Sequence, residues 1–269
     1  IYENIIKEKK IHHAESGNDY AFGRYLDGVI KGREQELGIQ IISPFNDDRE
    51  ADPHCAAKSV ATQQHMFVVL EEDNRFYQDI RLAEQTDKYI KHNNSASTPA
   101  TKRLLLDAKA EQNRGRKQDL KNRLSDALGR ASIVVNGTEL DIRTTDPKTR
   151  IIEGFQALVS NLYTQLIMLR VNYTHKSLEQ VFDVDMDDLF NESITEPELE
   201  ILTFLKSKKQ GGERCSVKAL LDHFTGRPYG WSEPAILTNT AKLLQRGKVE
   251  LLANATQLAG KQAYAQLSN

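Results

Sequence analysis

The chain has 269 residues, of which 28% are charged and 7% are aromatic, and its formal net charge is −2. This composition is typical of a folded, helix-rich protein, and it excludes a disordered chain or a globally basic nucleic-acid binder. Two cysteines far apart in the sequence, Cys55 and Cys215, favour a reducing cytoplasm over a disulfide scaffold. No apolar run approaches the roughly 20 residues of a membrane span. Because the chain starts at Ile1, without a Met or a signal sequence, we expect it to be part of a longer protein.

Residues 1–74 are predicted to form a small α/β unit. Apolar residues such as Tyr20, Tyr25 and Leu26 suggest a helix over residues 1–37 that Gly38 ends. The apolar runs 39–42 and 66–70 then predict two buried strands. Strands that alternate with helices indicate an α/β arrangement.

Residues 75–182 are predicted to form a helical region. Helices over 76–93 and 102–130, joined by a short polar loop, favour an antiparallel helical hairpin. Asn136-Gly137 predicts a β-hairpin across residues 131–143. A helix with a wide apolar arc is expected over residues 148–171, and residues 183–200 read as an acidic tether.

Residues 194–269 are predicted to form a winged-helix-like module. Thr195 and Glu198 have the spacing of a capping box that opens its first helix. A second helix is expected over 216–224, a third after Ser232, and a strand over 249–252. Trp231, in the turn before the third helix, is expected to be a core anchor. The predicted fold class is therefore α+β, mainly α with a few strands.

No motif for catalysis or cofactor binding is visible. A phosphate loop needs a Gly-rich turn before a Lys-Ser/Thr pair, but Gly247-Lys248 is followed by Val249. The histidines and cysteines lack zinc spacing, and no Ser stands in a nucleophile-elbow turn. We therefore expect no catalytic, cofactor-binding or metal-binding residue in this segment.

Two basic segments are candidates for contact with nucleic acid. Residues 102–130 carry nine basic and four acidic side chains, and residues 206–261 carry ten and four. Lys and Arg in such stripes can neutralise phosphates, although solvated helices are often this charged. Glu233 begins the third helix, where a helix-turn-helix protein would meet DNA, so sequence-specific reading is not expected. The candidate contact residues are Lys242, Arg246, Lys248, Arg227, Arg114, Arg116, Lys117 and Lys121.

Several segments in order resemble the large P-loop ATPases of bacterial BREX phage-defence systems, the BrxC/PglY group. They are the Tyr-Gly-Trp turn at 229–231, the strand before Gln85-Thr86-Asp87-Lys88-Tyr89-Ile90, and Tyr20-Ala21-Phe22 ahead of 38–44. The resemblance implies a segment downstream of the ATPase motifs, in a cytoplasmic multi-subunit complex that blocks phage replication. It carries no catalytic residue over to this chain.

Together with this resemblance, the sequence predicts a non-catalytic assembly region of a phage-defence ATPase, in which any contact with DNA is weak and without sequence preference. Its expected partners are other subunits of the complex, with no membrane contact, and self-association stays open. The alternative is a regulatory DNA-binding protein that reads DNA with the winged-helix-like module. A third hypothesis is an enzyme whose active site is completed by residues outside this segment.

Overall fold

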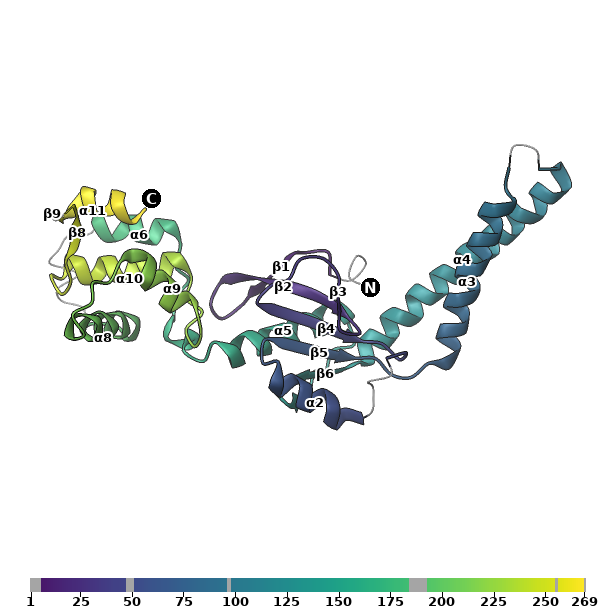
Figure 1. Cartoon of the computed structure of the whole chain (residues 1–269), viewed down its shortest axis with the longest axis horizontal. Coiled ribbons are helices and arrows are strands. Elements are labelled where there is room, and N and C mark those ends of the chain that lie inside the picture. Colours follow the sequence, from purple (N-terminus) through teal and green to yellow (C-terminus); the bar gives the residue numbers. More distant parts are fainter. Residues whose placement is uncertain (1–5, 47–50, 96–97, 184–192, 255, 269) are drawn as a thin grey trace. The chain divides into compact units, whose positions relative to one another are not determined.

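The computed structural model describes residues 6–46, 51–95, 98–183, 193–254 and 256–268. The chain forms two compact units (Figure 1). The first unit comprises Ile1–Ile11 and Tyr20–Leu158, and the second comprises His12–Asp19 and Val159–Asn269. The predicted boundaries at residues 74 and 182 do not coincide with this division. The difference arises because β6 and β7 join the sheet of the first unit, whereas α6 packs in the second.

A mixed β-sheet forms the centre of the first unit. In the part of the chain that the structure describes, the strand order is β1-β2-β4-β5-β6-β7, and β3 pairs with β2. Strands β2, β4 and β5 run parallel, whereas β6 is antiparallel to β5. The predicted strands at 39–42 and 66–70 are confirmed as β4 and β5. The strand bounds are β1 Lys10–His13, β2 Asn18–Leu26, β3 Val29–Ile30, β4 Leu37–Ile42, β5 His65–Val69, β6 Ser132–Val135 and β7 Thr138–Glu139.

Helices cover both faces of this sheet. Because side chains alternate along a strand, Phe67 of β5 packs with Cys55 of α2, whereas Met66 lies on the opposite face near Gly154 of α5. A Cβ on Gly154 would lie 2.8 Å from Ile133, so the glycine permits the close approach of α5 to the sheet. The central strands are therefore buried on both sides, which explains their continuous apolar sequences. The helix bounds are α2 Ala51–Ala61 and α5 Pro147–Leu162.

The predicted helix over residues 1–37 is wrong for residues 10–30, which form β1 to β3. Asp27 and Gly28 have φ angles of 51° and 79° and form the two-residue turn between β2 and β3. This pair is a strong hairpin signal because both residues need positive φ. The spacing of Tyr20 and Tyr25 resembled a helical stripe, but both residues belong to β2, where an odd spacing places them on opposite faces of the strand.

The predicted helical hairpin is confirmed. Helices α3 (Asn74–Asn93) and α4 (Ala100–Arg130) run side by side along the hairpin (Figure 1). The amide of Asn113, in the middle of α4, is buried and donates to Ala83 O at 2.9 Å and to Asp87 Oδ1 at 2.7 Å. Along this seam, polar groups therefore replace part of the apolar packing that usually joins two helices.

Arg123 holds the base of the hairpin. Its guanidinium donates to Asp73 Oδ2 at 2.6 Å and to Asp79 Oδ2 at 2.7 Å. Asp73 also accepts from Phe76 N at 2.9 Å and so caps α3. The hydrogen bond from Arg123 lowers the pKa of the Asp73 carboxyl. A single guanidinium thus joins α4 to the cap and the first turns of α3.

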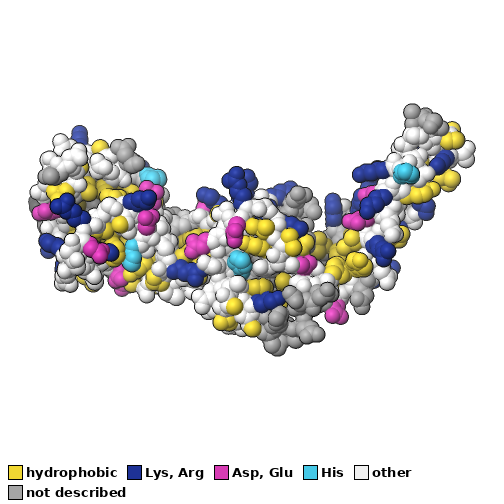
Figure 2. All heavy atoms as spheres, viewed as in Figure 1, with side chains coloured by type: hydrophobic (Ala, Val, Ile, Leu, Met, Phe, Trp, Pro, Cys, Tyr) yellow, Lys and Arg dark blue, Asp and Glu magenta, His cyan; other side chains and the backbone are white. Residues whose placement is uncertain are grey.

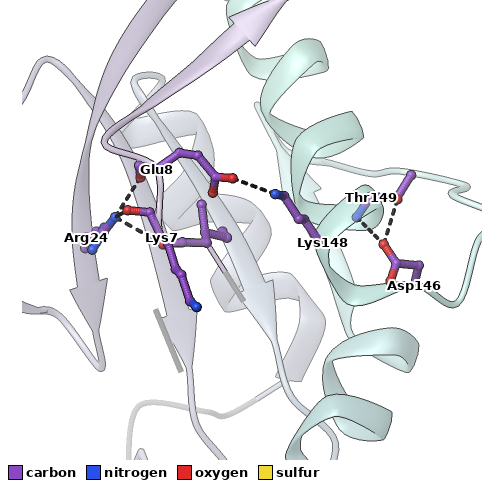
Figure 3. Close-up of polar contacts among 7 residues, drawn as sticks. Lys7, Glu8, Arg24, Asp146, Lys148 and Thr149 are labelled. Atoms are coloured by element: carbon purple, nitrogen blue, oxygen red, sulfur yellow. Dashed lines mark hydrogen bonds and ion pairs between the residues drawn. The ribbon is translucent and has the colours of Figure 1, made fainter. Parts of the chain in front are cut away.

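Helix α5 begins where the sequence predicts, with Asp146 as its cap (Figure 3). Asp146 Oδ2 accepts from Thr149 N at 2.8 Å and from Thr149 Oγ1 at 2.7 Å. Lys148, in the first turn of the same helix, donates to Glu8 Oε1 at 2.6 Å. The Glu8 backbone carbonyl in turn accepts from Arg24 Nη2 at 2.7 Å. Polar contacts therefore fasten the segment before β1 to β2 and to α5.

The end of α5 differs from the prediction of a helix to residue 171. The helix ends at Leu162 and is followed by a short 3₁₀ turn, Leu166–Met168. In the second unit Gln165 N donates to Pro228 O at 3.0 Å, a partner outside any helix. Tyr163 lies so close to Gly230 that a Cβ on this glycine would be 2.4 Å from the ring. Contacts with the distant residues Pro228 and Gly230 thus end α5, although the apolar sequence after Leu162 would allow the helix to continue.

The C-terminal module of the second unit is a winged helix, as predicted, and the fold class is α+β. Its helix α9 is capped by Ser216, whose Oγ accepts from Ala219 N at 3.1 Å. The acidic tether was predicted too long because residues 196–200 are helical, and residues 184–192 lie outside the described residues. The bounds are α6 His175–Asp183, α8 Glu196–Gln210, α9 Val217–Thr225, α10 Glu233–Gln245, β8 Leu251–Ala253, β9 Thr256–Leu258 and α11 Gly260–Leu267.

Trp231 anchors the turn between α9 and α10, as predicted, and only 1% of its surface is exposed. Its ring stacks on Phe224 with centroids 4.9 Å apart, and Tyr229 meets it edge-on at 5.2 Å. Its indole Nε1 donates to Gln165 O at 3.1 Å. One side chain therefore joins the turn to α9 and to the segment that follows α5.

We predict that Trp231→Ala lowers the unfolding free energy of the second unit by about 3–5 kcal/mol, because it deletes a buried aromatic. Trp231→Phe keeps a ring beside Phe224 but loses the bond to Gln165, so its loss should be smaller, about 1–2 kcal/mol. Ile167→Ala, at a side chain that is 79% exposed, is the control and should change little. Urea titration followed by circular dichroism measures all three, and equal midpoints for Trp231→Ala and Ile167→Ala would contradict the anchor.

Candidate functional site

Helix α10 occupies the position that reads DNA in helix-turn-helix proteins, but its side chains face the interior of the module. Of its thirteen residues, only Glu233 is well exposed to solvent. Helices α6, α8, α9 and α11 pack against it, and Leu178 and Val181 of α6 share a core with Leu237. Seven α10 residues are buried: Ala235, Ile236, Leu237, Thr238, Asn239, Ala241 and Leu243. More than half of this helix is therefore used in packing inside the module, and its partly exposed residues are Pro234, Thr240, Lys242, Leu244 and Gln245.

A buried carboxylate lies between α8 and α10. The Glu198 side chain is 0% exposed, and its oxygens lie 3.5 Å from Arg246 Nε and 3.9 Å from Lys242 Nζ. The predicted capping box is therefore wrong. Thr195 stands at the helix cap position without a side-chain capping bond, and Glu198 points to the cations instead of back to Thr195. Both distances exceed those of hydrogen bonds, so the contacts are ion pairs.

This ion pair changes the role of two candidate nucleic-acid contacts. The Arg246 side chain is 4% exposed and that of Lys242 is 23% exposed, and both face Glu198. Their charges therefore compensate a buried carboxylate. Lys248 and Arg227 lie on the exposed surface. Of the four candidate contacts in the module, Lys242 and Arg246 therefore face a buried carboxylate, whereas Lys248 and Arg227 face solvent.

The candidate contacts of the hairpin are mostly engaged with neighbouring side chains. Arg114 pairs with Glu111, Lys117 pairs with Asp87, and Arg116 donates to Asn113 Oδ1 at 2.9 Å. The hydrogen bond from Lys117 lowers the pKa of the Asp87 carboxyl. Lys121 is exposed. Figure 2 shows Lys and Arg side chains spread along the hairpin among other side chains rather than gathered in one patch.

Two further polar pairs shape the surface of the module. Tyr229 donates its hydroxyl to Glu200 Oε1 at 2.6 Å, and burial, together with this carboxylate, raises the pKa of Tyr229 to about 12. Lys208 donates to Glu213 Oε2 at 2.6 Å, and this bond lowers the pKa of the Glu213 carboxyl. Tyr229 is thus held as a neutral donor that fixes α8 to the turn.

Among the described residues, no group of three or more His, Cys, Asp or Glu side chains could hold a metal ion. The His13 imidazole contacts two serine hydroxyls: its Nε2 lies 3.2 Å from Ser160 Oγ, and its Nδ1 lies 3.0 Å from Ser16 Oγ. The imidazole is 1% exposed, and its two bonds hold the turn between β1 and β2. No helix of the described part is long and apolar enough to cross a membrane.

Two family models match the chain. The BREX ATP-binding protein BrxC 4th domain with six-stranded beta sheet matches residues 1–158. The BREX ATP-binding protein BrxC winged helix-turn-helix domain matches residues 171–268. The six strands of the path β1-β2-β4-β5-β6-β7 correspond to the first description, and β3 is a seventh strand that pairs with β2 beside this path. No solved structure matches the chain.

We predict that Glu198→Gln lowers the unfolding free energy of the second unit by about 3–5 kcal/mol, because it leaves the buried Arg246 charge uncompensated. Glu196→Gln is the matched control on the same helix. The Glu196 side chain is 58% exposed and pairs with Arg170 at the surface, so its loss should cost at most about 1 kcal/mol. Differential scanning calorimetry compares the two variants, and indistinguishable transitions would show that the ion pair does not hold the module together.

Proposed function

This chain belongs to the family of the BREX ATP-binding protein BrxC, and we propose that it serves there as a non-catalytic assembly region. Two general observations support this proposal. The sequence carries no phosphate loop, and the described residues contain no group that could hold a metal. Binding by complementary surfaces is the function that such a segment can perform without bound nucleotide or metal. Its partners are then other subunits of the phage-defence complex, in the cytoplasm.

The burial of α10 is the observation that carries the proposal. A winged helix that reads DNA must present one face of this helix to the major groove. Here α6 covers the face that Leu237 and Ala241 occupy, and α8 contributes Glu198 against the end of the helix. The module therefore offers its outer helices and its wing for binding. Such a surface suits the docking of proteins better than the reading of bases.

The alternative, a regulatory protein that reads DNA, finds less support. The exposed residue of α10 is Glu233, at the end that would approach the DNA, and a carboxylate there repels phosphates. DNA contact in our proposal is weak and made through phosphates. Lys121 of the hairpin and Lys248 of the module are exposed candidates for it.

We predict that DNA binding by the chain is independent of sequence and falls steeply with salt, because phosphate contacts release counterions. Lys121→Ala and Lys248→Ala should each flatten the log–log salt dependence by about 0.9, the value for one phosphate on duplex DNA. Lys9→Ala, at an exposed lysine outside both basic segments, is the control. Fluorescence anisotropy on two unrelated duplexes measures the effect. A preference of about a hundredfold or more for one duplex would support the DNA reader instead.

We predict that the chain forms a stable complex with at least one other purified subunit of a BREX system, because its outer surfaces are free for docking while its reader helix is not. Size-exclusion chromatography with light scattering measures the mass of the mixture. The same mixture after nuclease treatment is the control, since a complex bridged by DNA would then dissociate. If every purified subunit elutes separately from the chain, the assembly function is wrong.

A further inference from the structure

An apolar groove opens on the C-terminal module between α8, α9, α10, the wing and α11. It has a volume of about 70 Å³. Small-molecule sites occupy roughly 300–1,000 Å³, so this groove is too small for a cofactor but accepts one or two aliphatic side chains. Its apolar lining consists of Leu205, Val217, Leu220, Leu244, Val249, Leu251 and Leu267.

The segments that border the groove are basic. Residues 206–218 and 248–261 contain seven Lys or Arg and two Glu. Lys206, Lys218 and Lys248 are exposed and are sequence neighbours of the lining residues Leu205, Val217 and Val249. On the face of the module drawn in Figure 2, Lys and Arg side chains lie among hydrophobic and acidic ones. An apolar centre with a cationic rim favours a partner of the opposite pattern.

We propose that this groove binds an amphipathic, acidic α-helix of a partner protein, with aliphatic side chains in the groove and Asp or Glu side chains against its basic rim. This inference rests on the proposed assembly function and names the kind of partner segment that the module takes.

A helix fits the groove better than an extended strand for a reason of backbone chemistry. An extended segment needs hydrogen-bond partners for its own backbone, and the polar side chains in the lining are few: Ser216, Thr240, Glu250 and the thiol of Cys215. A helix satisfies its backbone internally and presents apolar side chains at positions i, i+3, i+4 and i+7 on one face. The small volume matches one or two such anchors.

A second copy of this chain is a poorer occupant. A symmetric dimer places the same patch of both copies face to face. Two cationic rims would then oppose each other, and like charges across an interface are unfavourable. The acidic helix therefore comes from a different protein, and self-association becomes an outcome of the test.

Cys215 offers a direct probe of occupancy because it lines the groove and is half-buried, whereas Cys55 is 5% exposed in the core of the first unit. The probe ligand is a synthetic peptide of about five helical turns, with Leu on one face and Glu on the other. A second peptide carries Lys in place of Glu. The rate of Cys215 alkylation by a maleimide, read by mass spectrometry, reports whether the groove is covered. Because burial raises the pKa of the Cys215 thiol, the reaction is run at a mildly alkaline pH.

Saturating acidic peptide should slow alkylation of Cys215 by about tenfold, since covering a thiol removes its access to reagent. The Lys peptide should bind about tenfold more weakly or not at all, a difference of about 1.4 kcal/mol. Raising the salt from about 0.1 M to about 0.5 M should weaken binding of the acidic peptide, because salt screens the rim.

Two variants of α8 test the location. Leu205→Gln changes a lining residue and should weaken binding of the acidic peptide by about tenfold. Leu199→Gln makes the same change at a side chain that is 56% exposed and outside the lining, so its affinity should stay unchanged. Melting temperatures of both variants show whether the module remains folded. Lys206→Glu together with Lys218→Glu reverses rim charges without touching the lining and should also abolish the preference for the acidic peptide.

Three results would overturn the proposal: no protection of Cys215, equal binding of both peptides, or protection that grows with protein concentration in the absence of peptide. The last result would assign the groove to a second copy of the chain. None of them would remove the assembly function, which is judged separately from the complexes that the chain forms with purified BREX subunits. Conversely, peptide binding without any such complex would leave the groove in place and refute its role in assembly.

Discussion

A fully buried carboxylate determines how the C-terminal module is arranged. Glu198 has no contact with solvent, so its charge has to be compensated within the fold, and Arg246 and Lys242 at the end of α10 supply that compensation. Charges that leave water need partners at close range. This requirement fixes α8 against α10, while α6, α9 and α11 pack on other sides of the same helix. Seven of the thirteen residues of α10 are therefore buried, and our proposal places the binding function of the module on the surfaces around this helix.

The charges of the two units follow a common pattern. In the hairpin, Arg123 forms ion pairs with Asp73 and Asp79. In the module, Arg246 and Lys242 form ion pairs with Glu198. A count of basic residues therefore overstates the charge that is available to a nucleic acid. The charge that remains exposed lies in scattered positions and around the apolar groove. This distribution favours a protein surface that combines a small apolar anchor site with cationic surroundings over a continuous phosphate-binding track.

Local signals in the sequence predicted local structure well. The Asn136-Gly137 turn and the helical hairpin were recognisable, because each depends on residues close together in the chain. The helix predicted over residues 1–37 was wrong although Asp27-Gly28 is itself a local turn signal. Other errors arose where distant residues decide the outcome. The spacing of Thr195 and Glu198 fits a capping box, yet a cation 48 residues away, Arg246, takes the carboxylate. For the same reason the sequence placed Arg246 among the candidate DNA contacts, since no local pattern reveals that an arginine is buried.

The hairpin α3–α4 is inserted between two strands that are direct neighbours in the sheet, β5 and β6. Val69 pairs with Ser132, so the chain leaves the sheet and returns to the adjacent position after the whole excursion. Arg123 and Arg130 contact Asp73 and Glu71 at the point where the excursion starts and ends. Closing a longer excursion costs little additional entropy. The pairing of β5 with β6 therefore places no requirement on the length of the arm between them.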